Sequence, residues 1–267
     1  MRQRSFTATE TLGRGLDVWV RSLPLASLLA VLIVAPLYTL FHFVSADTFG
    51  LGFSLQIVAM LFAQMVINGL VARVVFDRLD EVDIDLSQAS ATVLRRIGAI
   101  VPAAAVVALL AGACVVAAGL VSDAFATSPS NKQISFSILA GVVGCGVAAP
   151  FYLATCLAPA VAANEKGSFW RALREAARLS KGERMTLLSL HMLTLFVQVG
   201  IALVVLMPLR AVEDASPSML EPSTFVASML ALLLVQTAMG SVAATAYHDL
   251  KLRQEGFGIS ALKRIFE

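Results

Sequence analysis

The segment Ser168-Phe-Trp-Arg-Ala-Leu-Arg-Glu-Ala-Ala-Arg-Leu-Ser-Lys181, with the apolar runs Met185 to Leu209 and Thr224 to Tyr247 after it, decides the fold of this chain. The apolar side chains of the first segment recur at helical spacing, and its charged side chains occupy the other faces, which predicts an amphipathic helix. Each apolar run exceeds the about 20 residues that cross about 30 Å of hydrocarbon as a helix. The unit is therefore an interfacial helix followed by a hairpin of two spans.

Similar apolar runs fill the rest of the chain. The predicted spans are Pro24 to Val44, Leu51 to Phe76, Ile97 to Val121, Phe136 to Ala163, Met185 to Leu209 and Thr224 to Tyr247. Composition agrees, because 58% of the residues are hydrophobic, 14% are charged and the mean hydropathy is +0.82. Soluble domains do not have this composition. We predict an all-α polytopic membrane protein with six transmembrane helices.

The interfacial segment also recurs. Segments 9–22 and 87–96 show the same mixture of apolar and charged residues, and each precedes a pair of predicted spans. We therefore predict a single membrane domain over 1–267, built from pseudo-repeats of about 5–81, 82–166 and 167–256. A partial fourth amphipathic helix is predicted over 257–267.

The basic residues are strongly asymmetric. Of the 20 Lys and Arg residues, 18 lie on one side of the predicted membrane, and only Lys132 and Arg210 lie on the other. The positive-inside rule then places both termini in the cytoplasm. Cys114, Cys145 and Cys156 fall within predicted spans and are expected to be small buried apolar residues.

Two kinds of residue are candidates for lipid contact. Basic residues on the amphipathic segments are expected to reach anionic headgroups. They are Arg95, Arg96, Arg171, Arg174, Arg178 and Lys181. Trp19 and Trp170 are predicted interfacial anchors, because indole rings favour the headgroup level.

Amide side chains within the spans form a possible intramembrane polar site. An amide in hydrocarbon needs a hydrogen-bond partner, so it either joins two helices or faces a cavity. The candidates are Gln64, Asn68, Gln198 and Gln236. Gln64 and Gln236 lie at similar distances before the ends of their spans, so we expect both to point into the bundle. We favour a role in joining two helices over a role in a binding site.

The segments Pro159-Ala-Val-Ala-Ala-Asn-Glu165, Ser168-Phe-Trp-Arg-Ala-Leu173, Leu179-Ser-Lys-Gly182 and Tyr247-His-Asp-Leu-Lys-Leu-Arg-Gln-Glu-Gly256 carry a family resemblance. The chain resembles the six-span membrane domain of glycerophosphoryl diester phosphodiesterases and of YciC-like bacterial inner-membrane proteins. The resemblance covers most of the chain and is sharpest in its second half. It implies a fold and a bacterial inner-membrane location. No catalytic residue is implied, because the phosphodiesterase chemistry of fused relatives belongs to a soluble barrel that is missing from this sequence.

Catalytic and metal-binding motifs are missing. His42, His191 and His248 lie in different spans, with no H-E-x-x-H pattern. The pair His248-Asp249 stands among charged residues at a predicted membrane exit, which favours a solvated boundary over a metal site. We predict no enzyme activity, no metal and no cofactor.

Two function classes remain. The leading prediction is a non-catalytic integral membrane protein that binds lipid, or a protein partner at the cytoplasmic face, and organises the envelope. The alternative is a transporter of a small solute or lipid, favoured by prolines within spans but not by any clearly central charged residue. Nucleic acid is not an expected partner, and the sequence does not predict an oligomeric state.

Overall fold

Long apolar runs form helices in this chain because hydrocarbon offers no hydrogen-bond partner to an exposed backbone. The computed structural model describes residues 6–43, 51–80, 86–124, 131–215 and 220–255, and these contain helices and short connections but no strand. The helices are α1 (Ala8–Phe43), α2 (Leu51–Leu79), α3 (Leu86–Ala124), α4 (Asn131–Thr155), α5 (Ala158–Asn164), α6 (Phe169–Ser180), α7 (Arg184–Ala215) and α8 (Leu220–Glu255). The all-α prediction is confirmed.

Five segments of the described chain are long and apolar enough to cross a membrane, and one of them extends over both α4 and α5. They are Ile57–Leu79, Leu94–Ala117, Val142–Asn164, Arg184–Val205 and Val226–Gln254. They correspond to the second to sixth predicted spans. The first predicted span is helical up to Phe43 as part of α1, but most of its side chains lie outside the described ones. The chain is thus a candidate multi-pass membrane protein with at least five spans.

The fourth predicted span is not one helix. It was predicted to run from Phe136 to Ala163, but α4 ends at Thr155 and α5 begins at Ala158. Pro159 lies in the first turn of α5, where its missing N–H costs no helical hydrogen bond. A break before this proline separates a long helix from a short buried one.

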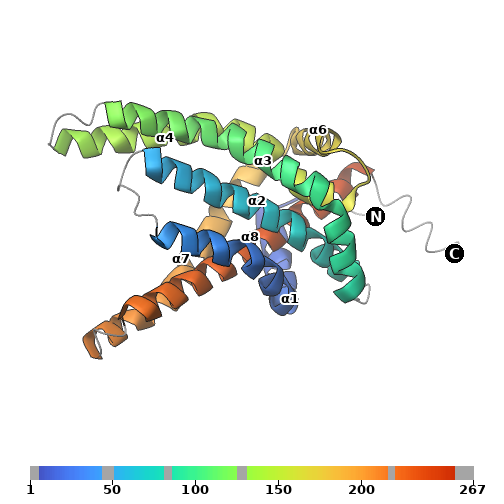
Figure 1. Ribbon diagram of the computed structural model, residues 1–267. Helices are drawn as coiled ribbons and strands as arrows, with labels where there is room; N and C mark the ends of the chain where they lie inside the picture. The colour runs from blue at the N-terminus through green and yellow to red at the C-terminus, as the bar shows by residue number, and fades with distance from the viewer. Residues whose placement is uncertain (1–5, 44–50, 81–85, 125–130, 216–219, 256–267) are drawn as a thin grey trace, which may run out of the picture.

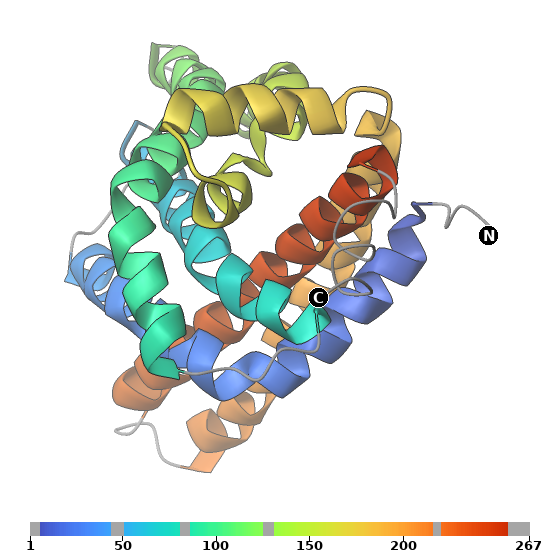
Figure 2. The ribbon, with the colours of Figure 1, turned by 90° about the vertical axis from the view of Figure 1, so that its right-hand side faces the viewer.

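The three predicted interfacial segments differ in structure. Segment 168–181 forms the separate helix α6, as predicted. Segments 9–22 and 87–96 were expected to be separate from the spans, and this is wrong: they are the first parts of α1 and α3, which continue past Pro24 and Pro102. Both helices change direction along their length (Figures 1 and 2). A proline inside a helix removes one backbone hydrogen bond and allows such a bend.

One end of the bundle carries all three of these segments. Figure 2 shows α6, the first part of α3 and the first part of α1 on three sides of this end, around the last turns of α2 and α8. Figure 1 shows the remaining lengths of the long helices running away from it, with the α3–α4 pair diverging from the α7–α8 pair. We call this end the collar end.

Helix α2 is the centre of the packing. Its span is 61% buried, against 11% for the span of α7. Gly69 on α2 is what allows α3 and α5 to approach, because a Cβ atom at this position would lie 2.5 Å from Ile100 Cγ2 and 3.1 Å from the main-chain oxygen of Pro159. The core therefore sits near the collar end, where α2, α3, α5 and α8 meet.

Candidate functional site

Three of the four predicted intramembrane amides come together in the core. Gln64 and Asn68 lie one turn apart on α2, and both are buried. Gln64 Nε2 donates to Asn68 Oδ1 (2.6 Å) and to the main-chain oxygen of Gln236 on α8 (3.0 Å). These contacts join α2 to α8, which is the role expected of amides that connect helices.

Two of the amides keep a polar atom without a partner. Gln236 Oε1 and Gln198 Nε2 are buried and find no hydrogen-bond partner among the described residues. Gln198 lies on α7, separate from the Gln64 contacts. An unpaired amide group in an apolar setting costs about 1–3 kcal/mol, so both atoms identify positions that a polar ligand or a water molecule would stabilise.

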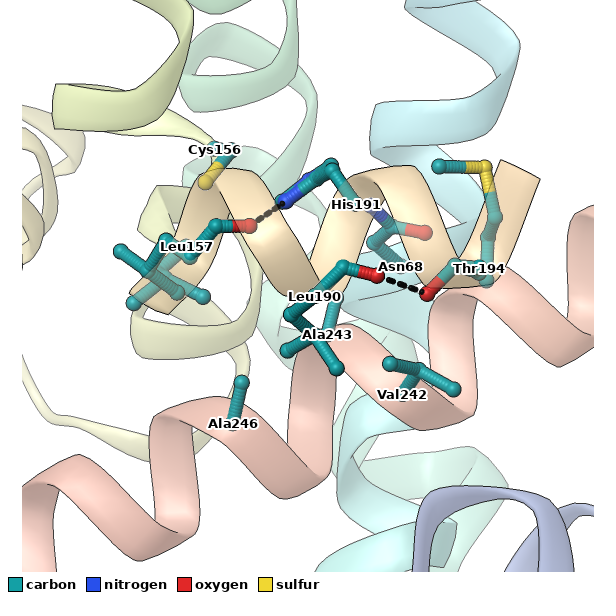
Figure 3. A pocket seen from close by; sticks show the side chains of 11 residues that line it. Asn68, Cys156, Leu157, Leu190, His191, Thr194, Val242, Ala243 and Ala246 are labelled. Carbon is teal, nitrogen blue, oxygen red and sulfur yellow. Dashed lines mark hydrogen bonds between the residues drawn. The ribbon is translucent and has the colours of Figure 1, made fainter. Parts of the chain in front are cut away.

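A small cavity lies between α2, the junction of α4 and α5, α7 and α8. Its volume of about 10 Å³ is near the minimum for one water molecule. Asn68, His191 and Thr194 are the amide, imidazole and hydroxyl residues that line it, and Figure 3 shows them beside one another. We call it the notch.

Hydrogen bonds to the backbone define the free polar atoms of the notch. His191 Nδ1 donates to the Leu187 oxygen (2.8 Å), which leaves Nε2 as an acceptor. Thr194 Oγ1 donates to the Leu190 oxygen (2.7 Å) and retains acceptor capacity. The notch thus offers acceptors to a ligand that carries a hydroxyl or an N–H group.

The last turns of α8 form a polar centre at the collar end. Tyr247 Oη and Lys251 Nζ both donate to Glu165 Oε1, each at 2.8 Å. Arg96 Nη1 donates to the main-chain oxygen of the same Glu165 (3.0 Å). Burial raises the pKa of Glu165, but the hydrogen bonds from Lys251 and Tyr247 and the charges of Lys251 and Arg171 outweigh it, and the net pKa is lowered.

The pair His248-Asp249 belongs to this centre. The sequence predicted a solvated boundary here, but His248 is only 7% exposed. Asp249 accepts from Arg14 (2.6 Å) and from Thr11 (3.0 Å) of α1, and His248 Nε2 lies 3.4 Å from Asp80 Oδ1. The prediction was wrong because α1 and α2 return to cover the end of α8.

The final turn of α8 reaches α6 and α7. Arg253 forms an ion pair with Glu183, between α6 and α7, and Gln254 donates to the main-chain oxygen of Leu179 (3.2 Å). The polar centre therefore connects α8 directly to α1 and α6. The start of α3 is connected indirectly, because Arg96 donates to Glu165, which binds Tyr247 and Lys251 of α8. Of its carboxylates, Glu165 accepts from Lys251 and Tyr247, Asp249 accepts from Arg14 and Thr11, and Asp80 lies against His248.

The predicted headgroup residues divide into two groups. Arg95, Arg171, Arg174 and Lys181 are exposed. Arg96 is half-buried against Glu165, and Arg178 forms an ion pair with Glu175 at 2.5 Å. The first group remains available for a headgroup. Arg96 and Arg178 already have partners within the protein, although the Arg178 side chain is 55% exposed.

The two predicted tryptophan anchors have different surroundings. Trp170 on α6 is 60% exposed. Trp19 is half-buried, and its Nε1 donates to Thr237 Oγ1 on α8 (3.0 Å). Leu173 and Ala176, on the apolar face of α6, are buried against the protein. Only Trp170 retains the geometry of an interfacial anchor.

A scan of protein-family models and searches of curated proteins and of solved structures found no match to this chain. The family resemblance therefore stays a prediction from the sequence.

Proposed function

We propose that this chain is a non-catalytic integral membrane protein that binds membrane lipid through its collar end and helps to organise the envelope. The observation that carries the proposal is the outer face of α6. Exposed Trp170 stands beside exposed Arg171 and Arg174, while the opposite face of the helix is buried against the bundle. An indole next to guanidinium groups is the combination that binds at the headgroup level of an anionic leaflet.

The other interfacial segments support the same proposal. Leu94 and Arg95 are both exposed at the start of α3, and Val20 is exposed on α1. Together with α6, these segments lie on three sides of the collar end (Figure 2). Apolar and basic side chains side by side on this ring fit contact with a membrane surface.

The finer architecture is part of the proposal. We propose six spans in three parallel pseudo-repeats, with α1 supplying the first span and the collar end facing the cytoplasm of a bacterial inner membrane. The excess of basic residues supports this orientation. A carboxylate near the end of each proposed hairpin belongs to the polar centre, which supports equivalent repeats: Asp80 lies against His248, Glu165 accepts from Tyr247 and Lys251, and Asp249 accepts from Arg14.

The test is the dependence of thermal stability on anionic lipid. The full chain is reconstituted in nanodiscs of phosphatidylcholine with increasing phosphatidylglycerol, and Tm is measured. We expect Tm to rise with the anionic fraction, and this rise to shrink in Arg171→Gln/Arg174→Gln, because each basic residue near the surface contributes about 1 kcal/mol. Arg21→Gln/Arg78→Gln removes the same charge from exposed positions elsewhere at the collar end, and a smaller effect of this variant would assign the larger share of lipid binding to α6. Equal Tm curves for both double variants and the parent would exclude lipid binding by α6.

Transport is the second candidate function. It is favoured by the buried, unpaired atoms Gln198 Nε2 and Gln236 Oε1, which a polar solute could satisfy. The volume of the notch argues against transport and so favours lipid binding, since about 10 Å³ has room for one water molecule at most. If Gln198→Met abolished solute uptake and left Tm unchanged, transport would be favoured over lipid binding.

A further inference from the structure

The side chains of α7 form no direct hydrogen bond to another helix among the described residues. Its polar side chains bond to the helix itself or to the turn before it: Thr186 to Glu183, His191 to Leu187 and Thr194 to Leu190. The span of α7 is also the least buried of the five candidate spans. The notch is where α7 faces the central helix α2, because residues of both helices line it.

The polar side chains of the notch have complementary free atoms. Asn68 Oδ1 is engaged by Gln64, but Asn68 Nδ2 has only the sulfur atom of Met65 as a partner, at 4.0 Å. Asn68 therefore retains a donor, because its NH₂ group carries two N–H bonds and sulfur is a weak acceptor. His191 Nε2 and Thr194 Oγ1 are acceptors, since Nδ1 and the hydroxyl proton are used within α7. One donor and two acceptors thus line the same cavity (Figure 3).

A water molecule matches this set of atoms. It accepts one hydrogen bond and donates two, and three hydrogen bonds are the usual number for a buried water. The notch volume of about 10 Å³ is close to the space that one water needs. Apart from Cys156, the rest of the lining consists of apolar side chains, and Leu157, Leu187 and Leu190 among them are at most 1% exposed. The three polar side chains are therefore the side-chain partners that the notch offers to a water.

The position of His191 suits this role. Its ring is held by the bond from Nδ1 to the Leu187 oxygen and by Tyr152 of α4, whose ring lies edge-to-face at 5.2 Å (83°). His191 is seven residues after the start of α7, which places it about 10 Å along the helix at 1.5 Å per residue. Water of the headgroup layer therefore has a short path to the notch.

We infer that the notch binds one structural water molecule, which connects α7 to α2. The water accepts from Asn68 Nδ2 and donates to His191 Nε2 and to Thr194 Oγ1. Bonds through such a water are enthalpically nearly as good as direct ones. The water thus supplies the hydrogen bonds between helices that the side chains of α7 do not make directly. This site is separate from the outer face of α6 and is independent of the proposed lipid binding.

X-ray footprinting tests for the water directly. X-rays ionise a bound water in place, and the hydroxyl radical that forms oxidises the nearest side chain. Cys156 is the reporter, because it lines the notch and is only 2% exposed. The full chain in nanodiscs is irradiated, and the oxidation rate of Cys156 is measured by mass spectrometry. We expect Cys156 to be oxidised in the parent, and most of this oxidation to be lost in Thr194→Val and in His191→Phe.

Thr245→Val is the matched control for Thr194→Val. Both threonines are buried and donate to the main-chain oxygen four residues before them, but Thr245 does not line the notch. Thr245→Val should therefore leave the oxidation of Cys156 unchanged. An unoxidised Cys156 in the parent, or equal oxidation in the parent and all three variants, would overturn the inference.

A double-mutant cycle tests the connection between the helices. The equilibrium constant for unfolding is measured for Asn68→Leu, Thr194→Val and the double variant, and the loss of the Gln64 bond to Asn68 cancels in the cycle. We expect a coupling of about twofold to tenfold, because either change alone breaks the same set of bonds to the water. The cycle of Asn68→Leu with Thr245→Val should be additive. Additive effects in both cycles would show that no water connects α2 to α7.

Discussion

Lys251 Nζ donates to Glu165 Oε1 at 2.8 Å and so joins the last turns of α8 to the end of α5, across 86 positions of sequence. Tyr247 Oη shares the same carboxylate oxygen. The ion pair is only partly exposed, with 29% of the Lys251 side chain and 20% of the Glu165 side chain accessible.

The Glu165 contact predicts a pH dependence of stability. Because the folded-state pKa of Glu165 is lowered, its stabilisation is complete above the unfolded-state value of about 4.3 and is lost as pH falls through the lower folded-state pKa. We expect Glu165→Gln to cost about 1–3 kcal/mol at pH 7. Chemical unfolding in detergent at pH 7, 5 and 3 should show the difference from the parent shrinking at pH 3. A constant difference would contradict the ionic role.

Gln64 and Gln198 predict opposite results for the same kind of change. Gln64→Leu removes the bonds to Asn68 and to Gln236, and should lower the free energy of unfolding by about 0.6–2 kcal/mol. Gln198→Met removes a buried N–H group that has no partner among the described residues, so stability should stay unchanged or rise. Thermal unfolding in one lipid composition compares the two. Equal destabilisation by both variants would refute this account.

Gly69 predicts a steric effect that Gly98 does not share. Gly69→Ala places a methyl group 2.5 Å from Ile100 Cγ2 and should cost about 1–3 kcal/mol. Gly98→Ala is the matched control, because no atom lies within 4 Å of its new Cβ and the helix gains up to about 1 kcal/mol. Tm values of both variants measure the two effects on stability. Partial rescue of Gly69→Ala by Ile100→Ala would assign the cost to this contact.

The two tryptophans predict different access to lipid. In Trp19→Phe the remaining Trp170 is exposed, so brominated lipid in the nanodisc should quench its fluorescence strongly. In Trp170→Phe the remaining Trp19 is bonded to Thr237, so quenching should be weak. Stronger quenching of Trp19 than of Trp170 would place α6 away from the interface.

The basic asymmetry predicts the membrane orientation. In a background without native cysteines, single cysteines at Asp47, Lys132 and Asp214 should react with an impermeant maleimide added to intact cells, and those at Asp83 and Lys181 should not. Asp47 and Asp83 lie outside the described residues, so this prediction rests on the sequence. The opposite labelling pattern would invert the proposed topology.

Local chemistry accounts for what could be predicted. Apolar run length identifies five spans, because a helix must stay apolar for about 20 residues to cross hydrocarbon. The helical spacing of apolar and charged residues over 168–181 predicts α6, because it places the two kinds of side chain on opposite faces of a helix. The boundary predicted near Pro24 was wrong because a proline is compatible with both a helix end and a bend, and α1 continues past it. The boundary predicted at Ile97 was wrong because α3 runs through Ile97 and Gly98 as one helix.

The sequence by itself thus determined the helical class, the apolar segments and the basic collar end, since each follows from side chains that are neighbours along the chain. Only the tertiary structure decided the hydrogen-bond partners. Asp249 meets Arg14 across 235 positions, and Trp19 meets Thr237 across 218. Pairing stabilises a buried polar group, but its partner depends on which distant helix lies within about 3 Å of it.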